Sequence, residues 1–229
     1  MTTESSLTYS DYLRLPEMLA LQTSVGPPDM PMHAQAAEHF FIVVHQAFEL
    51  WFKQQLLDLR CASAALDADE CEVAVEHLLR VAAIQRLLND QMLLLDLLPP
   101  RSFLVFRPSL GTASGSESAQ ARQVWHALGL RSLDESPVWV AFRSALTRVG
   151  IDLESLYREP SRCGMLYRVA EALVDVSEAN WLMVAMHVGI ADRAIGDRPG
   201  TAGTSGVNYL MEALKEKAFP ELWAVRTRL

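Results

Sequence analysis

The sequence is poor in cysteine and in lysine. Its three cysteines, Cys61, Cys71 and Cys163, make an odd number and form no CxxC pair, which argues against a disulfide framework and a thiolate zinc site. Lysine occurs only three times, basic residues are scattered without a block, and the formal net charge is −8. Nucleic acid is therefore excluded as an expected partner.

The chain also lacks the apolar segments that direct proteins to membranes. Residues 1–6 have neither a basic start nor an apolar core, so they do not match a signal peptide. The most apolar long run, residues 181–191, contains His187 and is too short to span a bilayer. We therefore expect a cytoplasmic protein without a membrane partner.

No stretch shows the period-two alternation of a half-buried strand, whereas apolar residues recur at three and four positions over long segments. Half of the 229 residues are hydrophobic, which is enough for a substantial core. The sequence predicts an all-α fold, a single domain over residues 1–229 built as a bundle of long antiparallel helices, with residues 1–8 disordered. The three longest helices are expected near residues 39–65, 70–98 and 164–195.

Two serines mark further helix starts. Ser136 followed by Pro137 is typical of an N-cap and a first helical position, and predicts a helix to Val149. Ser114 with Glu117 matches a capping box and predicts a helix that runs to about Leu128. Residues 9–22 carry another helical pattern.

The segment 39–53 contains no proline or glycine and is apolar along two adjacent stripes. His45 lies in the stripe of Phe41, Phe48 and Phe52, so its imidazole is expected among aromatic rings in a helix that is buried over most of its girth. A buried imidazole needs a hydrogen-bond partner or a ligand. A core histidine bonded to a backbone carbonyl and a ligand-binding histidine both satisfy this pattern.

His187 is a second histidine on a largely apolar helix. Helix bundles build haem and metal sites from facing helices, and a neutral imidazole is a common axial ligand of haem iron. A di-iron carboxylate site would instead need Glu-x-x-His on two helices, and the glutamate spacing does not fit it. Two structural histidines remain the alternative to a haem site.

Two other features suit the recognition of charged groups. Arg107 follows aromatic residues and precedes a proline, an arrangement suited to bidentate capture of a carboxylate, or to a surface arginine that covers Phe106. The segment 200–206 holds three glycines and three hydroxyl side chains, and its backbone N–H groups could bind an anion. An ordinary helix-terminating loop has the same composition.

Several motifs follow one another in an order that is similar to one known family. They are His45-Gln46 with Glu49-Leu50-Trp51 and Lys53, Phe106-Arg107 before Leu110-Gly111 and Ser114-Gly115, Pro199-Gly200-Thr201 before Ser205-Gly206-Val207, Leu7-Thr8-Tyr9 at the start, and Phe219-Pro220-Glu221-Leu222-Trp223 near the end. In this order they resemble the tryptophan 2,3-dioxygenase family. The resemblance covers most of the chain except about residues 123–162, where this chain is shorter.

The resemblance implies haem b held between helices, with His187 as the proximal ligand of the iron. It implies that His45 is the distal catalytic residue, which accepts a hydrogen bond from the substrate's indole N–H. Phe41 would line the indole pocket, and Ser114 would lie near the haem on the oxygen side.

The resemblance also implies how an amino-acid substrate is held. Arg107 would pair with the carboxylate, and Thr201 would help to hold the ammonium and carboxylate groups. Phe103 stands where the family usually has a tyrosine that contacts the carboxylate. Tyr12 would reach the pocket of a neighbouring subunit, because the family is typically a homotetramer.

The activity implied by the resemblance inserts both atoms of O2 into the indole ring of L-tryptophan or a close analogue and gives an N-formylkynurenine-type product. Phe103 and the segment 183–186, which replaces a basic, tryptophan-containing run before His187, depart from the family pattern. A haem-dependent monooxygenase of tryptophan, a substituted indole or tyrosine in specialised metabolism is one alternative. A non-catalytic haem- or indole-binding bundle is the other, although Arg107 and the 200–206 loop argue against it.

Overall fold

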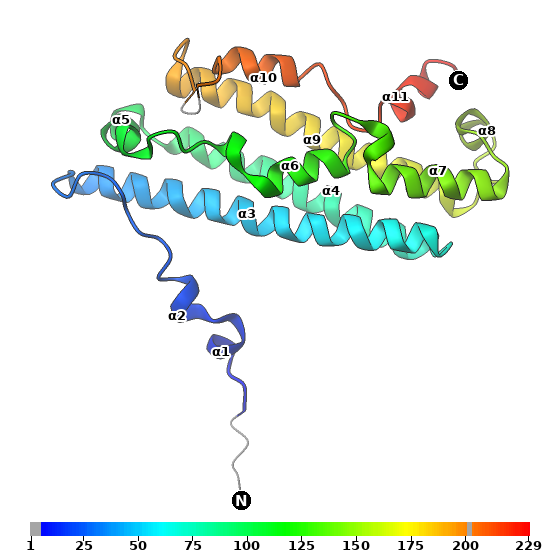
Figure 1. Ribbon diagram of the computed structural model, residues 1–229, viewed down its shortest axis with the longest axis horizontal. Helices are drawn as coiled ribbons and strands as arrows, with labels where there is room; N and C mark the ends of the chain where they lie inside the picture. The colour runs from blue at the N-terminus through cyan, green and yellow to red at the C-terminus, as the bar shows by residue number, and fades with distance from the viewer. Residues whose placement is uncertain (1–5, 201–202) are drawn as a thin grey trace, which may run out of the picture.

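The structure is a computed structural model that describes residues 6–200 and 203–229, and within these ranges every regular element is helical (Figure 1). The predicted all-α fold is confirmed. The long helices are α3 (Met32–Asp67), α4 (Cys71–Leu94) and α9 (Met165–Ile195). The shorter ones are α1 (Tyr9–Leu13), α2 (Leu15–Met18), α5 (Pro100–Phe106), α6 (Ala119–Ala127), α7 (Pro137–Val149), α8 (Leu153–Arg158), α10 (Val207–Ala213) and α11 (Pro220–Arg226), with 3-10 turns η1 (Leu95–Leu97), η2 (Arg107–Leu110), η3 (Gly115–Glu117) and η4 (Leu133–Glu135).

The three long helices do not all run antiparallel. A tight turn joins α3 to α4, so these two are antiparallel as expected (Figure 1). Arg86 of α4 pairs with Asp175 of α9 at 3.6 Å, and Asp96, in the turn η1 directly after α4, pairs with Arg193 of α9 at 3.5 Å, so the residue numbers of the partners rise together. The helices α4 and α9 are therefore parallel, and the antiparallel expectation is wrong for this pair. The segment α5–α8 carries the chain back to the end from which α4 started, so α9 repeats its direction.

One large apolar cluster fills the space between the long helices and the crossover segment. It joins α3, α4 and α9 to α6 and α7, which lie along α3. Fully buried aromatic residues lie at its centre, including Trp139, Phe142 and Phe219. The indole of Trp139 stacks on Phe219 with ring centroids 5.9 Å apart, so the C-terminal segment belongs to the same core. Burial of large aromatic side chains contributes much of the energy of such a core.

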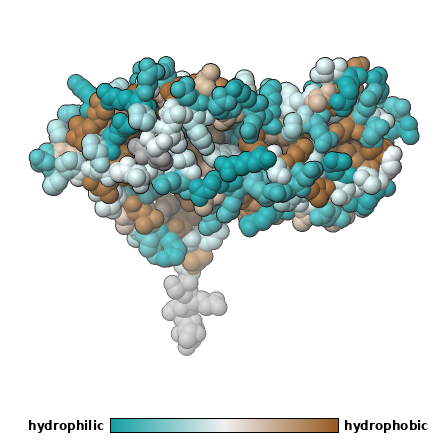
Figure 2. All heavy atoms as spheres, turned by 45° about the horizontal axis from the view of Figure 1, so that its top comes forward, coloured by the Kyte–Doolittle hydropathy of each residue, from teal (hydrophilic) through white to brown (hydrophobic). Residues whose placement is uncertain are grey.

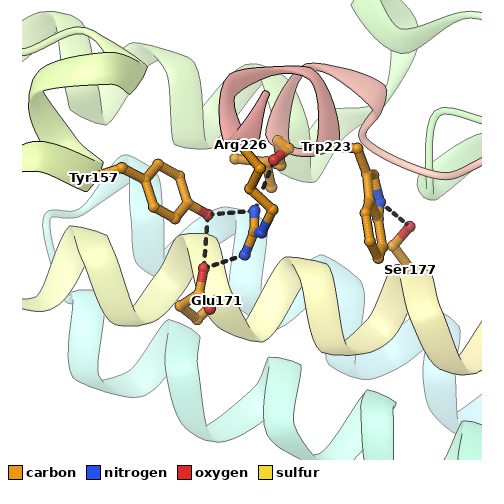
Figure 3. Close-up of polar contacts among 6 residues, drawn as sticks. Tyr157, Glu171, Ser177, Trp223 and Arg226 are labelled. Atoms are coloured by element: carbon orange, nitrogen blue, oxygen red, sulfur yellow. Dashed lines mark hydrogen bonds and ion pairs between the residues drawn. The ribbon is translucent and has the colours of Figure 1, made fainter. Parts of the chain in front are cut away.

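The C-terminal helix α11 is fixed to α9 by side chains that also anchor the segment before it (Figure 3). Ser177 is fully buried; its hydroxyl donates to the carbonyl of Ala218 at 2.7 Å and accepts from the indole N–H of Trp223 at 2.9 Å. Arg226 donates to Glu171 at 2.6 Å and to the Tyr157 hydroxyl at 3.0 Å. The α9 residues in these contacts, Glu171 and Ser177, lie well before His187 in the sequence, so the contacts stabilise the frame rather than the site.

A second, smaller apolar cluster lies where the start of α3 meets α5. Its buried members are Met30, Ala34, Ala37 and Phe106, and Phe41 and Phe103 pack against it. This cluster is separate from the main core and lies beside His45 of α3, so it forms the frame of the candidate site.

Several predicted boundaries differ from the structure. The pattern over residues 9–22 forms two short helices, because Arg14 between them has a positive φ of 52°. Thr8, expected to be disordered, caps α1 by accepting from the amide of Asp11. Ser114 does form the predicted capping box, but on the turn η3; the following helix α6 begins later and is capped by Ser118.

Two other boundaries are as predicted or nearly so. Helix α7 runs from Pro137 to Val149, with the Ser136 hydroxyl accepting from the amide of Trp139. Helix α3 begins at Met32, seven residues before the expected start. In the part of the chain that the structure describes, no helix combines the length and apolar character that a bilayer crossing requires.

Candidate active site

His45 is held in one tautomer by the backbone of its own helix. Its Nδ1 lies 2.7 Å from the carbonyl oxygen of Phe41, one turn earlier in α3. A carbonyl can only accept, so Nδ1 carries the proton and Nε2 keeps its lone pair. The predicted hydrogen bond of a core histidine is present, and it leaves Nε2 free to act as an acceptor.

Aromatic rings pack around His45. The ring of Phe41 lies 4.0 Å from the imidazole, between centroids, and is also 5.8 Å from Phe103 and 5.7 Å from Phe106. Phe103 and Phe106 meet edge to face at 5.3 Å. The three phenylalanines form an aromatic wall beside the imidazole, built from α3 and α5. A planar aromatic ligand would find favourable offset or edge contacts on such a wall.

His187 lies on α9 and faces the interior, yet solvent reaches it. Met183 and Ile190 are on the same face of α9, at i−4 and i+3, and both are buried. His187 between them is exposed. This imidazole is therefore accessible although it lies between two buried residues of the same helix face. The electrostatic interaction of His187 with His45 shows that the two histidines lie within reach of each other.

Both imidazoles are held neutral by their surroundings. Burial lowers the pKa of His45, and the bond to Phe41 and the charge of Glu49 offset only part of that shift. The protein atoms around His187 desolvate it enough to lower its pKa although the residue is exposed in part, and the neighbouring His45 lowers the pKa further. At neutral pH each ring thus offers an unprotonated nitrogen, which is what a metal ligand or a hydrogen-bond acceptor requires.

These residues fit a haem group. An accessible, neutral, inward-facing imidazole on one helix and a second on the facing helix are the donor set that bundles use for haem. In the described residues no three His, Cys, Asp or Glu side chains gather as a protein-ligated metal site would require.

Arg107 connects α5 to the loop that follows α9. Its guanidinium donates to the carbonyl of Pro199 at 3.0 Å, across 92 positions of sequence. Guanidinium has five N–H donors, so this contact leaves others for a carboxylate. The loop closes on itself through Gly200, whose amide donates to Thr204 at 3.1 Å. The structure therefore brings the predicted arginine and the predicted loop together.

For the remaining predicted site residues, the structure gives no contact with His45, His187 or Arg107 within the described ranges. Thr201 lies outside the described residues. Ser114 is half-buried and its contacts are local, with Ser116 and the cap of η3. Tyr12 is 72% exposed on α1, a helix with no buried residue that projects from the bundle (Figure 1). A role for Tyr12 would require a second copy of the protein.

The structure adds residues that the sequence patterns did not single out. Met30 is buried against the aromatic wall, and Glu38 is buried on the same face of α3 as Phe41 and His45. Neither position has a spacing signal, because both depend on how the loop before α3 folds back. Gln46 donates to the carbonyl of Leu21, which holds the end of the N-terminal arm on α3.

The lowered histidine pKa values predict how the haem-free protein responds to acid. An unfolded histidine has a pKa near 6.5 and His45 in the folded protein has a lower one, so the unfolded chain binds more protons just below pH 6.5. Stability should therefore be greatest above pH 6.5 and should decrease as the pH falls toward the folded pKa. Urea unfolding between pH 8 and 5 measures this.

His45→Gln should unfold with a weaker dependence on pH than the wild-type protein over this range. His126→Gln is the matched control, because His126 is an exposed histidine on α6. A slope that is the same in all three proteins would contradict the prediction.

Comparison with known proteins identifies one family. The family model described as tryptophan 2,3-dioxygenase matches residues 1–147 and 142–229, which together span the chain. A protein named tryptophan 2,3-dioxygenase from Caulobacter vibrioides is 32% identical over 266 aligned positions, covering 97% of this chain and 98% of the relative. Proteins of the same name from Kineococcus radiotolerans and Myxococcus xanthus are each 33% identical over 97% of this chain, covering 91% and 89% of their own lengths.

The two matched parts of the family model meet at residues 142–147, within α7. The alignment with the Caulobacter protein is also longer than this chain, 266 positions against 229 residues, so the relative carries additional residues. The break near α7 falls inside the region that the sequence indicated to be shortened. On both sides of it the match extends to the ends, and the chain belongs to the tryptophan 2,3-dioxygenase family.

Proposed function

We propose that this protein is a haem-dependent dioxygenase that inserts both atoms of O2 into the indole ring of L-tryptophan or a close analogue and yields an N-formylkynurenine-type product. The observation that carries the proposal is the His45–Phe41 pair. It offers a fixed hydrogen-bond acceptor beside an aromatic wall, which is the complement of an indole with its N–H. Family membership supports the same activity.

In this proposal His187 is the proximal ligand of haem b, and the bound haem supplies the oxygen-activating chemistry. The residues of the chain bind and orient the substrate. Nε2 of His45 accepts the indole N–H, and Phe41 and Phe103 contact the rings and exclude water. Because orientation alone can lower a barrier by several kcal/mol, about 7 or more in well-aligned intramolecular reactions, this positioning is a large part of what the protein contributes.

The charged end of the substrate is held on the other side of the pocket. Arg107 pairs with the carboxylate while its remaining N–H keeps the bond to Pro199, and Thr201 assists from the adjacent loop. Phe103 lacks a hydroxyl that a tyrosine would offer. One neutral hydrogen bond contributes about 1 kcal/mol net, so this difference weakens binding without redirecting the reaction.

The proposal includes a homotetramer in the cytoplasm, with Tyr12 reaching the pocket of a neighbouring subunit and Ser114 near the haem. Helices α1 and α2 have no buried residue and project from the bundle (Figure 1). On the face drawn in Figure 2, hydrophobic residues are interleaved with hydrophilic ones. Exposed apolar side chains such as Leu19 and Leu50 supply the surface that a subunit contact buries.

Turnover of L-tryptophan under 18O-labelled dioxygen tests the activity. We expect an N-formylkynurenine-type product that carries two labelled atoms, because both oxygens enter the ring. A product with one labelled oxygen and an intact ring would instead identify the monooxygenase alternative. If the haem-loaded protein formed no product from any aromatic amino acid, the non-catalytic binding bundle would be the alternative that remains.

A further inference from the structure

Glu38 is a buried carboxylate whose partners all come from the loop before α3. Its side chain accepts from the amides of Val25 at 2.8 Å and Gly26 at 2.9 Å, and from the hydroxyl of Ser24. The residue is 1% exposed, and none of the ion pairs among the described residues includes it. A buried charge of this kind is costly unless donors surround it, so these contacts hold the loop in one position.

Gly26 lies close to the ends of the Glu38 and Met30 side chains. A Cβ at Gly26 would come within 2.9 Å of the Glu38 carboxylate and within 2.5 Å of the Met30 side chain. The loop, the carboxylate and Met30 are thus in close contact, and a larger residue at position 26 would have to displace the ends of both side chains. The backbone of Met30 is held as well, since the Gln35 amide donates to its carbonyl at 2.8 Å.

Met30 transmits the position of the loop to the aromatic wall. It is 5% exposed and belongs to the apolar cluster that holds Phe106, with Phe41 and Phe103 packed against it. Phe41 in turn is the ring that contacts His45. Glu38, Phe41 and His45 are spaced at i, i+3 and i+7 on one face of α3, so the anchored loop and the imidazole border the same side of the helix.

We propose that Glu38 is a positioning residue of the substrate pocket. Its carboxylate anchors the loop 24–30, which seats Met30 against the wall of Phe41, Phe103 and Phe106 and so sets the depth of the pocket for the indole. This inference rests on the proposed function. Glu38 itself does not react with the substrate, because its oxygens are already occupied by the loop.

A series of substitutions separates the position of the carboxylate from its charge. Glu38→Gln keeps the length and an oxygen acceptor, and the hydroxyl of Ser24 can rotate to accept from the new amide. Glu38→Asp keeps the charge but is one methylene too short to reach the loop amides. Anchoring therefore predicts that Gln resembles the wild type and that Asp resembles Glu38→Ala. A role for the charge itself predicts the reverse, that Asp resembles the wild type and Gln resembles Glu38→Ala.

Glu76→Ala, at an exposed site on α4, is the control.

Two measurements are made on each haem-loaded variant. For Asp and Ala, hydrogen exchange of the Val25 and Gly26 amides should accelerate, and KM for L-tryptophan should rise roughly tenfold or more while kcat stays within about threefold. Gln and the control should retain wild-type values. Faster exchange with an unchanged KM would overturn the proposal, as would a larger loss in Gln than in Asp.

The exchange measurement does not depend on catalysis. If the wild-type protein bound haem but did not turn over tryptophan, the proposed function would fail, while exchange would still show whether Glu38 anchors the loop. If the Ala variant did not fold, the comparison of Gln with Asp would still decide between the two orders.

Discussion

Replacing His187 by alanine is expected to remove the histidine-ligated haem spectrum while the protein remains folded. The imidazole is exposed and its pKa is lowered, so it offers an unprotonated nitrogen to iron at neutral pH. Alanine offers no ligand in its place. The Soret band of the reconstituted variant should be lost or shifted to that of a different axial ligand, in both the ferric and the ferrous state. Added imidazole should restore part of the wild-type spectrum, since residue 187 is exposed and its removal leaves room for a free imidazole.

Two control variants show which histidine binds the iron. His45→Ala should retain the proximal spectrum, because Nδ1 of His45 is bonded to Phe41 and its ring is covered by that phenylalanine. His126→Ala, at an exposed site on α6, should behave as the wild type. Unchanged ferric and ferrous spectra in His187→Ala, with altered spectra in His45→Ala, would mean that the two roles are exchanged.

Local signals in the sequence were sufficient where the structure depends on local contacts. Helix α7 has the predicted bounds because Ser136 caps it, Pro137 suits its first turn, and Gly150 ends it with a positive φ of 72°. The capping box of Ser114 and Glu117 is also formed, but only a 3-10 turn follows it. The sequence showed the cap and could not show how far the helix would continue.

Residue spacing could not predict features that depend on tertiary structure. The break at Arg14 needs a positive φ at a non-glycine residue, which periodicity does not show. His77 is half-buried and lies 2.7 Å from the buried carboxylate of Asp58 on α3, a contact that helical periodicity does not indicate. The direction of α9 depends on the path of the whole crossover segment. In each case tertiary packing overrides the local pattern.

In the candidate site, too, local features could be predicted from the sequence and contacts between distant residues could not. The aromatic stripe around His45 follows from helical periodicity, and the structure confirms the stripe as ring contacts. The link between Arg107 and the loop after α9 joins residues 92 positions apart, and it was expected only from the family resemblance. The anchoring of the loop by Glu38 has no sequence signal at all. Its donors are backbone amides, which every residue except proline carries.

Replacing Arg107 by leucine is expected to weaken the binding of L-tryptophan by about 2–4 kcal/mol, or roughly 30- to 700-fold, as measured by titration of the haem-loaded protein. Arg107 is half-buried and loses a charge-assisted, forked contact that leucine cannot replace. Tryptamine lacks the carboxylate, so its binding should fall by less than about threefold. Arg101→Leu, at an exposed position on α5, is the control for loss of a positive charge nearby.

The comparison of the two ligands also separates the two contacts of Arg107. Its guanidinium holds the carbonyl of Pro199, so leucine could act indirectly by loosening the loop after α9. Loosening of the loop would weaken the binding of L-tryptophan and of tryptamine alike. Loss of the carboxylate contact would weaken the binding of L-tryptophan alone. Arg107→Lys refines the distinction, because lysine keeps the charge and one donor but not the planar fork. The lysine variant should recover only part of the affinity for L-tryptophan. Equal losses of affinity for both ligands in the leucine variant would show instead that Arg107 acts through the loop.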